Sequence, residues 1–362
     1  MKTAFTLICF YAILIGCENN KKIQSPSALL VDSIIINNVE DYNVILNMEY
    51  LNKNTFVSFN FNDNTFKKFK SNNTKKFHLV ASKSFLKDST FHSFNKLSDS
   101  SFLLIDYNNE HYILDTNLNY YTYSLHQRKK SLSTNFINSG LKYHPVILKD
   151  SILISTFYYT QLEDYNKYLK EPSISEYQIK KNEIIENKSY FIKPASLLNY
   201  QLPFPRFCFN KNKIILIYPC FDTLYIYDRN TNHISKYNIG NIEFKKPEKW
   251  EYNKLATENY NSYNTKYSLK NFKYYSIYYN PNTEHFILYY TSPTSQNTQS
   301  PILKALVLDN KYNKIQNYTF SEKIYFETEN FIVIPNKGIA MPLFPNNPNK
   351  NETNIVYHIY NF

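Results

Sequence analysis

The feature that most constrains the fold of this chain is a short unit that recurs along most of its length. Each copy has an apolar strand, a polar turn, a second apolar strand, a turn with Asp or Asn, and a third strand. Short alternating strands joined by Asx turns at regular intervals are typical of antiparallel all-β repeats. The clear copies span 44–70, 102–124, 213–237 and 286–320, and two looser copies span 152–192 and 331–360.

Six similar units predict how the chain closes on itself. One unit cannot bury both of its faces, so neighbouring units must pack together. We therefore expect an all-β fold, a six-bladed β-propeller of four-stranded antiparallel blades. Segment 28–36 is a strand without a local hairpin partner, and no strand follows 354–360. The N-terminal strand is expected to complete the last blade and remove an exposed edge. A single or double β-sandwich is the alternative.

Composition supports strands and excludes several classes of enzyme. The chain has 35 Tyr and 27 Phe, and aromatic residues favour half-buried pleated surfaces. It has only four Gly. A P-loop, a dinucleotide fingerprint and a Gly-x-Ser-x-Gly elbow all need glycines that this sequence does not place.

The N-terminus has the pattern of an export signal. Lys2 is followed by an apolar run over 4–15, which ends in Leu14-Ile15-Gly16-Cys17. The run is too short to span a bilayer as a helix. We expect a lipoprotein signal peptide over 1–16, lipid attachment at Cys17, a tether over 17–25, and one propeller over 26–362 with a long insertion near 240–272. An ordinary signal peptide with an incidental cysteine is the alternative.

These features together resemble a known group of proteins. The lipobox at Cys17, segment 54–61, and segment 202–207 leading into 213–228 resemble uncharacterised bacterial lipoproteins with a TolB-like six-bladed propeller, a domain of unknown function. The resemblance covers essentially the whole mature chain. Its motifs describe blades rather than chemistry. It implies a cell-envelope protein, and Glu18 after the cysteine favours the outer membrane, facing either the periplasm or the surface.

The charge points away from nucleic acid as a partner. The net charge is +11, but the lysines are scattered and only three Arg occur. An exported protein of this charge is better matched to anionic lipid or acidic glycan than to nucleic acid. AT-rich codon bias, which enriches Lys, Asn, Ile, Tyr and Phe together, is the simpler explanation of the charge.

The two cysteines beyond the anchor are expected to be buried free thiols. A hairpin turn at 210–213 would place Cys208 opposite about Ile215. Cys220 would then lie too far along the strand for the Cα spacing of a disulfide, about 5.5 Å.

Catalytic and metal signatures are not evident. No two of the eight His stand at ligand spacing, and the turns at Asp115, Asp228 and Asp309 lack the Gly and Glu of calcium loops. We predict no metal and no cofactor. The candidate binding residues are those expected near the propeller funnel and one in the insertion: Arg206, Tyr143, His144, Tyr274 and Trp250. A salt bridge for Arg206 and a plug over its own blade for Trp250 are the structural alternatives.

Two functions are compatible with these features. The first is a monomeric, lipid-anchored, non-enzymatic binding or scaffold module that presents a loop-rich face to a protein or glycan. The second is a hydrolase or lyase that acts on a glycan or peptide, with a site assembled in the funnel. Convergent carboxylates and histidines with shifted pKa values would favour the second.

Overall fold

The computed structural model describes part of the chain, and several predictions lie outside that part. The signal peptide, Cys17, the tether, Tyr143 and His144 are outside it. Among the described residues, no helix has the length and apolar character needed to cross a membrane. The described residues are 30–37, 48–61, 63–71, 75–85, 91–106, 110–117, 119–126, 136–137, 147–149, 152–158, 172–180, 183–190, 192–194, 197, 205–250, 267, 270–293, 302–320, 331–334, 336–343 and 354–362.

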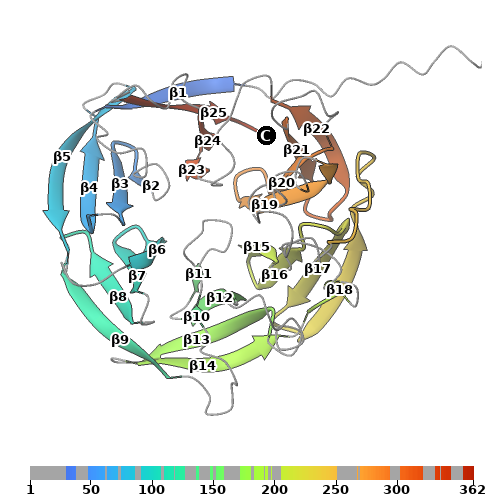
Figure 1. Cartoon of the computed structure of the whole chain (residues 1–362), viewed down its shortest axis with the longest axis horizontal. Coiled ribbons are helices and arrows are strands. Elements are labelled where there is room, and N and C mark those ends of the chain that lie inside the picture. The colour runs from blue at the N-terminus through green and yellow to red at the C-terminus, as the bar shows by residue number, and fades with distance from the viewer. Residues whose placement is uncertain are drawn as a thin grey trace, which may run out of the picture.

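The strands form a propeller-like ring around a central axis (Figure 1). This confirms the all-β class. The strands are β1 Leu30–Asn37, β2 Met48–Asn52, β3 Thr55–Asn60, β4 Thr65–Lys70, β5 Lys76–Ser84, β6 Phe91–Ser98, β7 Ser101–Asp106, β8 His111–Asp115, β9 Tyr120–His126, β10 Phe136–Ile137, β11 Ile147–Lys149, β12 Ile152–Tyr158, β13 Ile174–Lys180, β14 Glu183–Tyr190, β15 Arg206–Asn210, β16 Lys213–Ile217, β17 Thr223–Asp228, β18 His233–Asn238, β19 Lys273–Asn280, β20 His285–Thr291, β21 Leu303–Leu308, β22 Lys314–Thr319, β23 Ile332–Ile334, β24 Gly338–Pro342 and β25 Asn354–Tyr360.

In the described part of the chain, four sheets make up the ring. Two of them are four-stranded antiparallel meanders, β15-β16-β17-β18 and β19-β20-β21-β22. An eight-stranded sheet runs β2-β3-β4-β5-β1-β25-β24-β23, and its two antiparallel halves meet at the parallel pair β5 and β1. The nine-stranded sheet likewise contains two antiparallel halves, which meet at the parallel pair β14 and β9.

The N-terminal strand pairs with the C-terminal strand, as predicted. β1 runs antiparallel to β25, with Leu30 opposite Tyr360 and Asn37 opposite Asn354. The Asp32 carboxylate on β1 lies 2.5 Å from the Lys75 ammonium and 3.4 Å from the Lys337 ammonium. These contacts hold the first described strand between two turns that are distant in sequence.

The turns between strands have the predicted Asx chemistry. Asp115 Oδ1 accepts hydrogen bonds from the backbone N–H groups of Asn117 and Asn119, at 2.8 and 2.9 Å. Asp309 Oδ1 accepts them from Lys311 and Asn313, at 2.8 and 2.7 Å. An Asx side chain that binds backbone two to four residues ahead closes a turn without outside help.

The two ends of the sheets differ in the length of the connections that they carry. At one end, which we call the turn end, the connections between the described strands have two to five residues, as at 211–212 and 309–313. All connections longer than five residues begin and finish at the other end, which we call the loop end. The antiparallel registers fix this division within each sheet. β1 begins at the turn end, where Asp32 reaches Lys337 in the β23–β24 turn.

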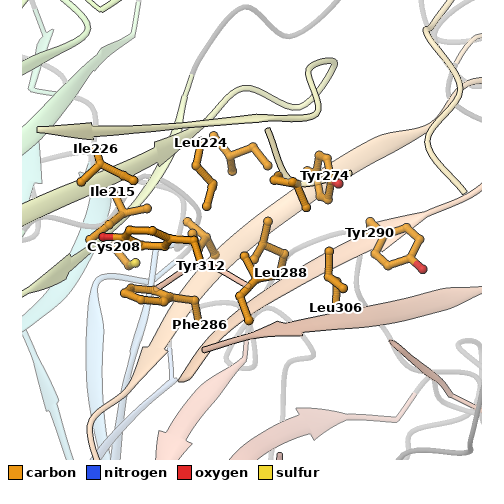
Figure 2. Close-up of a cluster of buried hydrophobic side chains, with 14 of the residues drawn as sticks. Cys208, Ile215, Leu224, Ile226, Tyr274, Phe286, Leu288, Tyr290, Leu306 and Tyr312 are labelled. Carbon is orange, nitrogen blue, oxygen red and sulfur yellow. The ribbon is translucent and has the colours of Figure 1, made fainter. Parts of the chain in front are cut away.

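Apolar side chains fill the space between neighbouring sheets. In Figure 2, Ile215 and Leu224 of one meander face Leu288 and Leu306 of the next. Each fully buried Leu or Ile contributes about 1.5 to 3 kcal/mol of transfer free energy. Packing between sheets, in addition to pairing within them, therefore holds the ring together.

Candidate functional site

Polar side chains gather at the loop end where the meanders β15–β18 and β19–β22 meet. We call this group the stem cluster, because it lies where the 240–272 insertion leaves and rejoins the ring. Figure 2 shows Tyr274 and Tyr290 at one end of the apolar cluster. The stem cluster comprises Asp222, Asn241, Glu243, Tyr274, Tyr290, Ser292 and Lys304.

One half of the stem cluster is centred on Asp222, in the β16–β17 connection. The Tyr274 hydroxyl donates to Asp222 Oδ1 at 2.7 Å, and the Asn241 backbone N–H donates to Oδ2 at 3.0 Å. Asn241 Nδ2 donates to the Tyr274 hydroxyl at 3.3 Å. Burial raises the pKa of Asp222 despite these donors. Burial and the Asp222 carboxylate also raise the pKa of Tyr274.

The other half is centred on Glu243, at the start of the insertion. Ser292 Oγ donates to Glu243 Oε2 at 2.5 Å, and the Tyr290 hydroxyl donates to Oε1 at 3.2 Å. The Lys304 ammonium forms an ion pair with the same carboxylate. Burial acts to raise the pKa of Glu243, but the hydrogen bonds from Lys304 and Ser292 outweigh it and the pKa is lowered. Glu243 is therefore ionised, and its side chain links the start of the insertion to the sheet.

Trp250 is packed inward, as in the plug alternative. Its side chain is 6% exposed, and its ring meets Tyr267 edge to face with centroids 4.9 Å apart. The Tyr267 hydroxyl donates to the Glu248 carbonyl at 2.5 Å, and the Glu248 N–H donates to Asn271 Oδ1 at 2.7 Å. Trp250 thus joins the two described ends of the insertion.

Arg206 is also buried, at 2% exposed. Its Nε donates to the backbone carbonyl of Tyr275 at 2.8 Å. The contact joins the first residue of β15 to β19, the strand that carries Tyr274. Of the predicted funnel residues that the structure describes, Arg206 and Tyr274 therefore lie in neighbouring strands, and both bind protein groups. Their roles as ligand-binding residues stay predictions.

Sequence reasoning missed a second polar network, between β13–β14 and β17–β18. Arg229 donates to both oxygens of the buried Glu176 carboxylate, at 2.7 Å from Nε and 3.1 Å from Nη2. The Tyr190 hydroxyl donates to Glu176 Oε1 at 3.0 Å. The Lys188 ammonium donates to the Tyr227 hydroxyl at 2.9 Å. The scarcity of arginine was the available signal, since a guanidinium suits paired, bidentate contacts.

The carboxylates of both networks are held by donors from the protein itself. Among the residues that the structure describes, no three His, Cys, Asp or Glu side chains are placed to hold a metal ion. Cys208 and Cys220 are buried free thiols, and Cys208 lies opposite Ile215, both as predicted. Burial raises the pKa of Cys220 to about 12. A thiol with so high a pKa is a poor nucleophile.

Comparisons with known proteins place the chain by its fold. No protein-family model and no curated protein sequence matches it. The crystal structure of a DUF4221 family member from Bacteroides vulgatus is similar, with a TM-score of 0.70 at 13% identity, over 93% of this chain and 98% of that chain. The structure of YCF48 bound to D1 peptide matches with a TM-score of 0.45 at 8% identity, over 93% and 100%. The first similarity shows a shared fold for nearly the whole chain, and an identity of 13% shows no shared activity.

Proposed function

We propose that this protein is a lipid-anchored β-propeller of the bacterial cell envelope that binds a protein or glycan partner through its loop end. The observation that carries the proposal is the division between the two ends of the sheets. All long connections meet the described strands at the loop end, and the chain enters the first strand at the turn end. Loops on a rigid scaffold are where binding residues concentrate.

Six blades form part of this proposal. The two meanders count as two blades, and the halves of the eight- and nine-stranded sheets count as four more. Six apolar clusters in the described part of the chain join successive blades in a closed cycle. The cycle ends where Tyr357 of β25 packs in one cluster with Phe56 of β3. An experimental density map with a different number of radial sheets would refute this count.

Anchoring in the outer membrane rests on the lipobox at Cys17. A thioether-linked diacylglycerol with a further acyl chain holds a protein stably at a bilayer. Metabolic labelling with tritiated palmitate in a bacterial host is expected to label the full chain and to fail in Cys17→Ser. Fractionation should recover the labelled protein with the outer membrane. Equal labelling of both forms would refute the lipid attachment.

A binding role, rather than a hydrolase or lyase activity, is supported by carboxylates that are already hydrogen-bonded within the protein. Asp222, Glu243 and Glu176 each accept hydrogen bonds from the fold, so their oxygens are engaged. A catalytic acid or base has to reach its substrate instead. We therefore assign Asp222 and Glu243 to the support of the loop end, and Glu176 to the contact between neighbouring sheets.

The binding face can be tested by masking each end in turn. Lys249→Cys at the loop end and Lys311→Cys at the turn end accept a maleimide polyethylene glycol, while the buried Cys208 and Cys220 do not. Solubilised envelope proteins and glycans are then passed over each labelled protein in detergent. Retention should be lost with the mask at position 249 and kept with the mask at 311. Turnover of an envelope glycan or peptide by the unmasked protein would instead favour the hydrolase or lyase alternative.

A further inference from the structure

We propose that the outward side of segment 242–249, together with Ile302, is a docking surface for an acidic polypeptide segment. We call it the Ile242 patch, and it comprises Ile242, Lys245, Lys246, Lys249 and Ile302. The inference rests on the proposed function in that it names the partner class for the loop end.

The segment lies on the ring with two distinct sides. Asn241, Pro247 and Trp250 are buried and Phe244 is half-buried, so the inward positions recur every third residue. Of the residues between them, Ile242, the three lysines and Glu248 are exposed, whereas the Glu243 side chain binds Tyr290, Ser292 and Lys304 on the ring. A segment held in this way presents a fixed row of side chains.

Contacts on the inward side fix the backbone from both ends. The Asn241 N–H is bound by Asp222, and the Glu243 N–H donates to Asn241 Oδ1 at 3.0 Å. The Phe244 ring meets Phe272 edge to face at 5.1 Å. Trp250 packs on Tyr267. A surface that is already ordered loses less entropy on binding a partner.

Two aliphatic side chains are exposed on this surface. Ile242 is 79% exposed and Ile302 is 54% exposed. Glu243, next to Ile242, forms its ion pair with Lys304, two residues after Ile302. This ion pair holds segment 242–249 next to the segment that begins at Ile302. Exposed apolar side chains beside a rigid polar cluster are typical of an interaction surface.

The charge of the patch selects an acidic partner. Lys245, Lys246 and Lys249 are exposed, and none forms an ion pair with a residue that the structure describes. Lys270, where the insertion rejoins the ring, is also exposed. Complementary potentials steer association and select partners.

A polypeptide fits the patch better than an acidic glycan. Sugar rings stack on exposed aromatic faces, but among the residues that the structure describes here Phe272 and Trp250 are buried. The side chains that form the patch are aliphatic and basic. A segment that alternates acidic and aliphatic residues matches both.

The test uses the full-length protein in detergent and two fluorescent probes. One probe is a short peptide of Glu and Leu, and the other is polygalacturonate. The charge-reversal variant Lys245→Glu/Lys246→Glu/Lys249→Glu should weaken peptide binding about tenfold. Ile242→Ser should weaken it about threefold. The matched control Lys53→Glu/Lys213→Glu/Lys311→Glu, at the turn end, should leave it unchanged.

Each result decides between the alternatives. Peptide binding that is equal in the patch variants and the turn-end control overturns the proposal, as does an absence of peptide binding to the unaltered protein. Polygalacturonate binding that is tighter than peptide binding and insensitive to Ile242→Ser assigns the patch to an acidic glycan instead. A failure of lipid anchoring in the palmitate experiment leaves these affinities unaffected, so the two proposals fail separately.

Discussion

The two ends of the ring are built by different kinds of contact. At the turn end, Asp309 and Asp115 close their own turns through atoms two to four residues away. At the loop end, the Tyr274 hydroxyl binds Asp222 across 52 residues of sequence, and Glu243 pairs with Lys304 across 61. These Asx turns are therefore local motifs, to which the turn end adds the ion pairs of Asp32 with the distant Lys75 and Lys337. The loop end depends on the packing of neighbouring sheets, so a change there is expected to affect partners far along the chain.

The largest expected effect compares two glycines with positive φ in the described part of the chain, one at each end. Gly338 has φ +134°, and a Cβ there would lie 2.1 Å from the Tyr360 carbonyl oxygen. Gly338→Ala should lower the free energy of unfolding by about 3 kcal/mol, because β24 cannot then pair with β25 as it does. Gly240→Ala, with φ +64° and no atom within 4 Å of the added Cβ, should lower it by about 1 kcal/mol.

Urea unfolding of the two glycine variants is the measurement. Equal effects would show that the close approach of Gly338 to Tyr360 of β25 contributes nothing beyond backbone strain. The turn end would then tolerate an added Cβ as well as the loop end does.

The next effect concerns the stem cluster. Tyr274→Phe removes the donor to the half-buried Asp222 carboxylate and should lower the free energy of unfolding by about 2 kcal/mol. Tyr290→Phe is the matched control, because Glu243 keeps Ser292 and Lys304 as partners, and its effect should be about 1 kcal/mol. Urea unfolding at pH 7 measures both. A smaller loss for Tyr274→Phe than for Tyr290→Phe would contradict the central place of Asp222.

Two carboxylates, Asp32 at the turn end and Asp222 at the loop end, should respond to pH with opposite sign. Burial acts to raise the pKa of Asp32, but the Lys75 hydrogen bond and charge outweigh it and the pKa is lowered. Its contribution to stability is present above the unfolded value, about 3.9, and is lost as the pH falls through the folded value. The pKa of Asp222 is raised by burial. Asp222 therefore makes stability fall as the pH rises from about 3.9 through its folded value.

Unfolding by urea between about pH 3 and pH 7 separates these two contributions. Relative to the unaltered protein, Asp32→Asn should gain less stability as the pH rises, and Asp222→Asn should gain more. If the free energy of unfolding changed with pH equally in both variants, the expected difference between Asp32 and Asp222 would be wrong.

The smallest expected effect is the loss of one Asx turn. Asp309→Ala removes the acceptor for the N–H groups of Lys311 and Asn313 and should lower the free energy of unfolding slightly, because water can replace hydrogen bonds in an exposed turn. Lys311→Ala, at an exposed side chain in the same turn, should change it by less than about 0.5 kcal/mol. Thermal unfolding followed by circular dichroism compares the two. A loss as large as that expected for Tyr274→Phe would mean that this turn also depends on distant contacts.

Sequence reasoning anticipated much of the fold but little of the candidate site. The repeat placed β7, β8 and β9 within one or two residues, because apolar alternation and Asx turns are properties of a few adjacent residues. Cys208 opposite Ile215 followed from the same local logic. Tyr274 was singled out, but neither Asp222 nor Glu243 was, since nothing near either residue in sequence points to its partner. The Glu176–Arg229 pair was missed for the same reason.

The strands, the turns and their order therefore follow from the sequence alone. Hydrogen bonds within a turn and the two-residue period of a strand act over distances that a short peptide already spans. The tertiary structure alone decided which polar groups meet. Asp222, Glu243, Tyr274 and Lys304 come from four separate segments, and they become neighbours because two apolar sheet faces pack together beneath them. The burial of Trp250 against Tyr267 and the exposure of Ile242 likewise appear only in the tertiary structure.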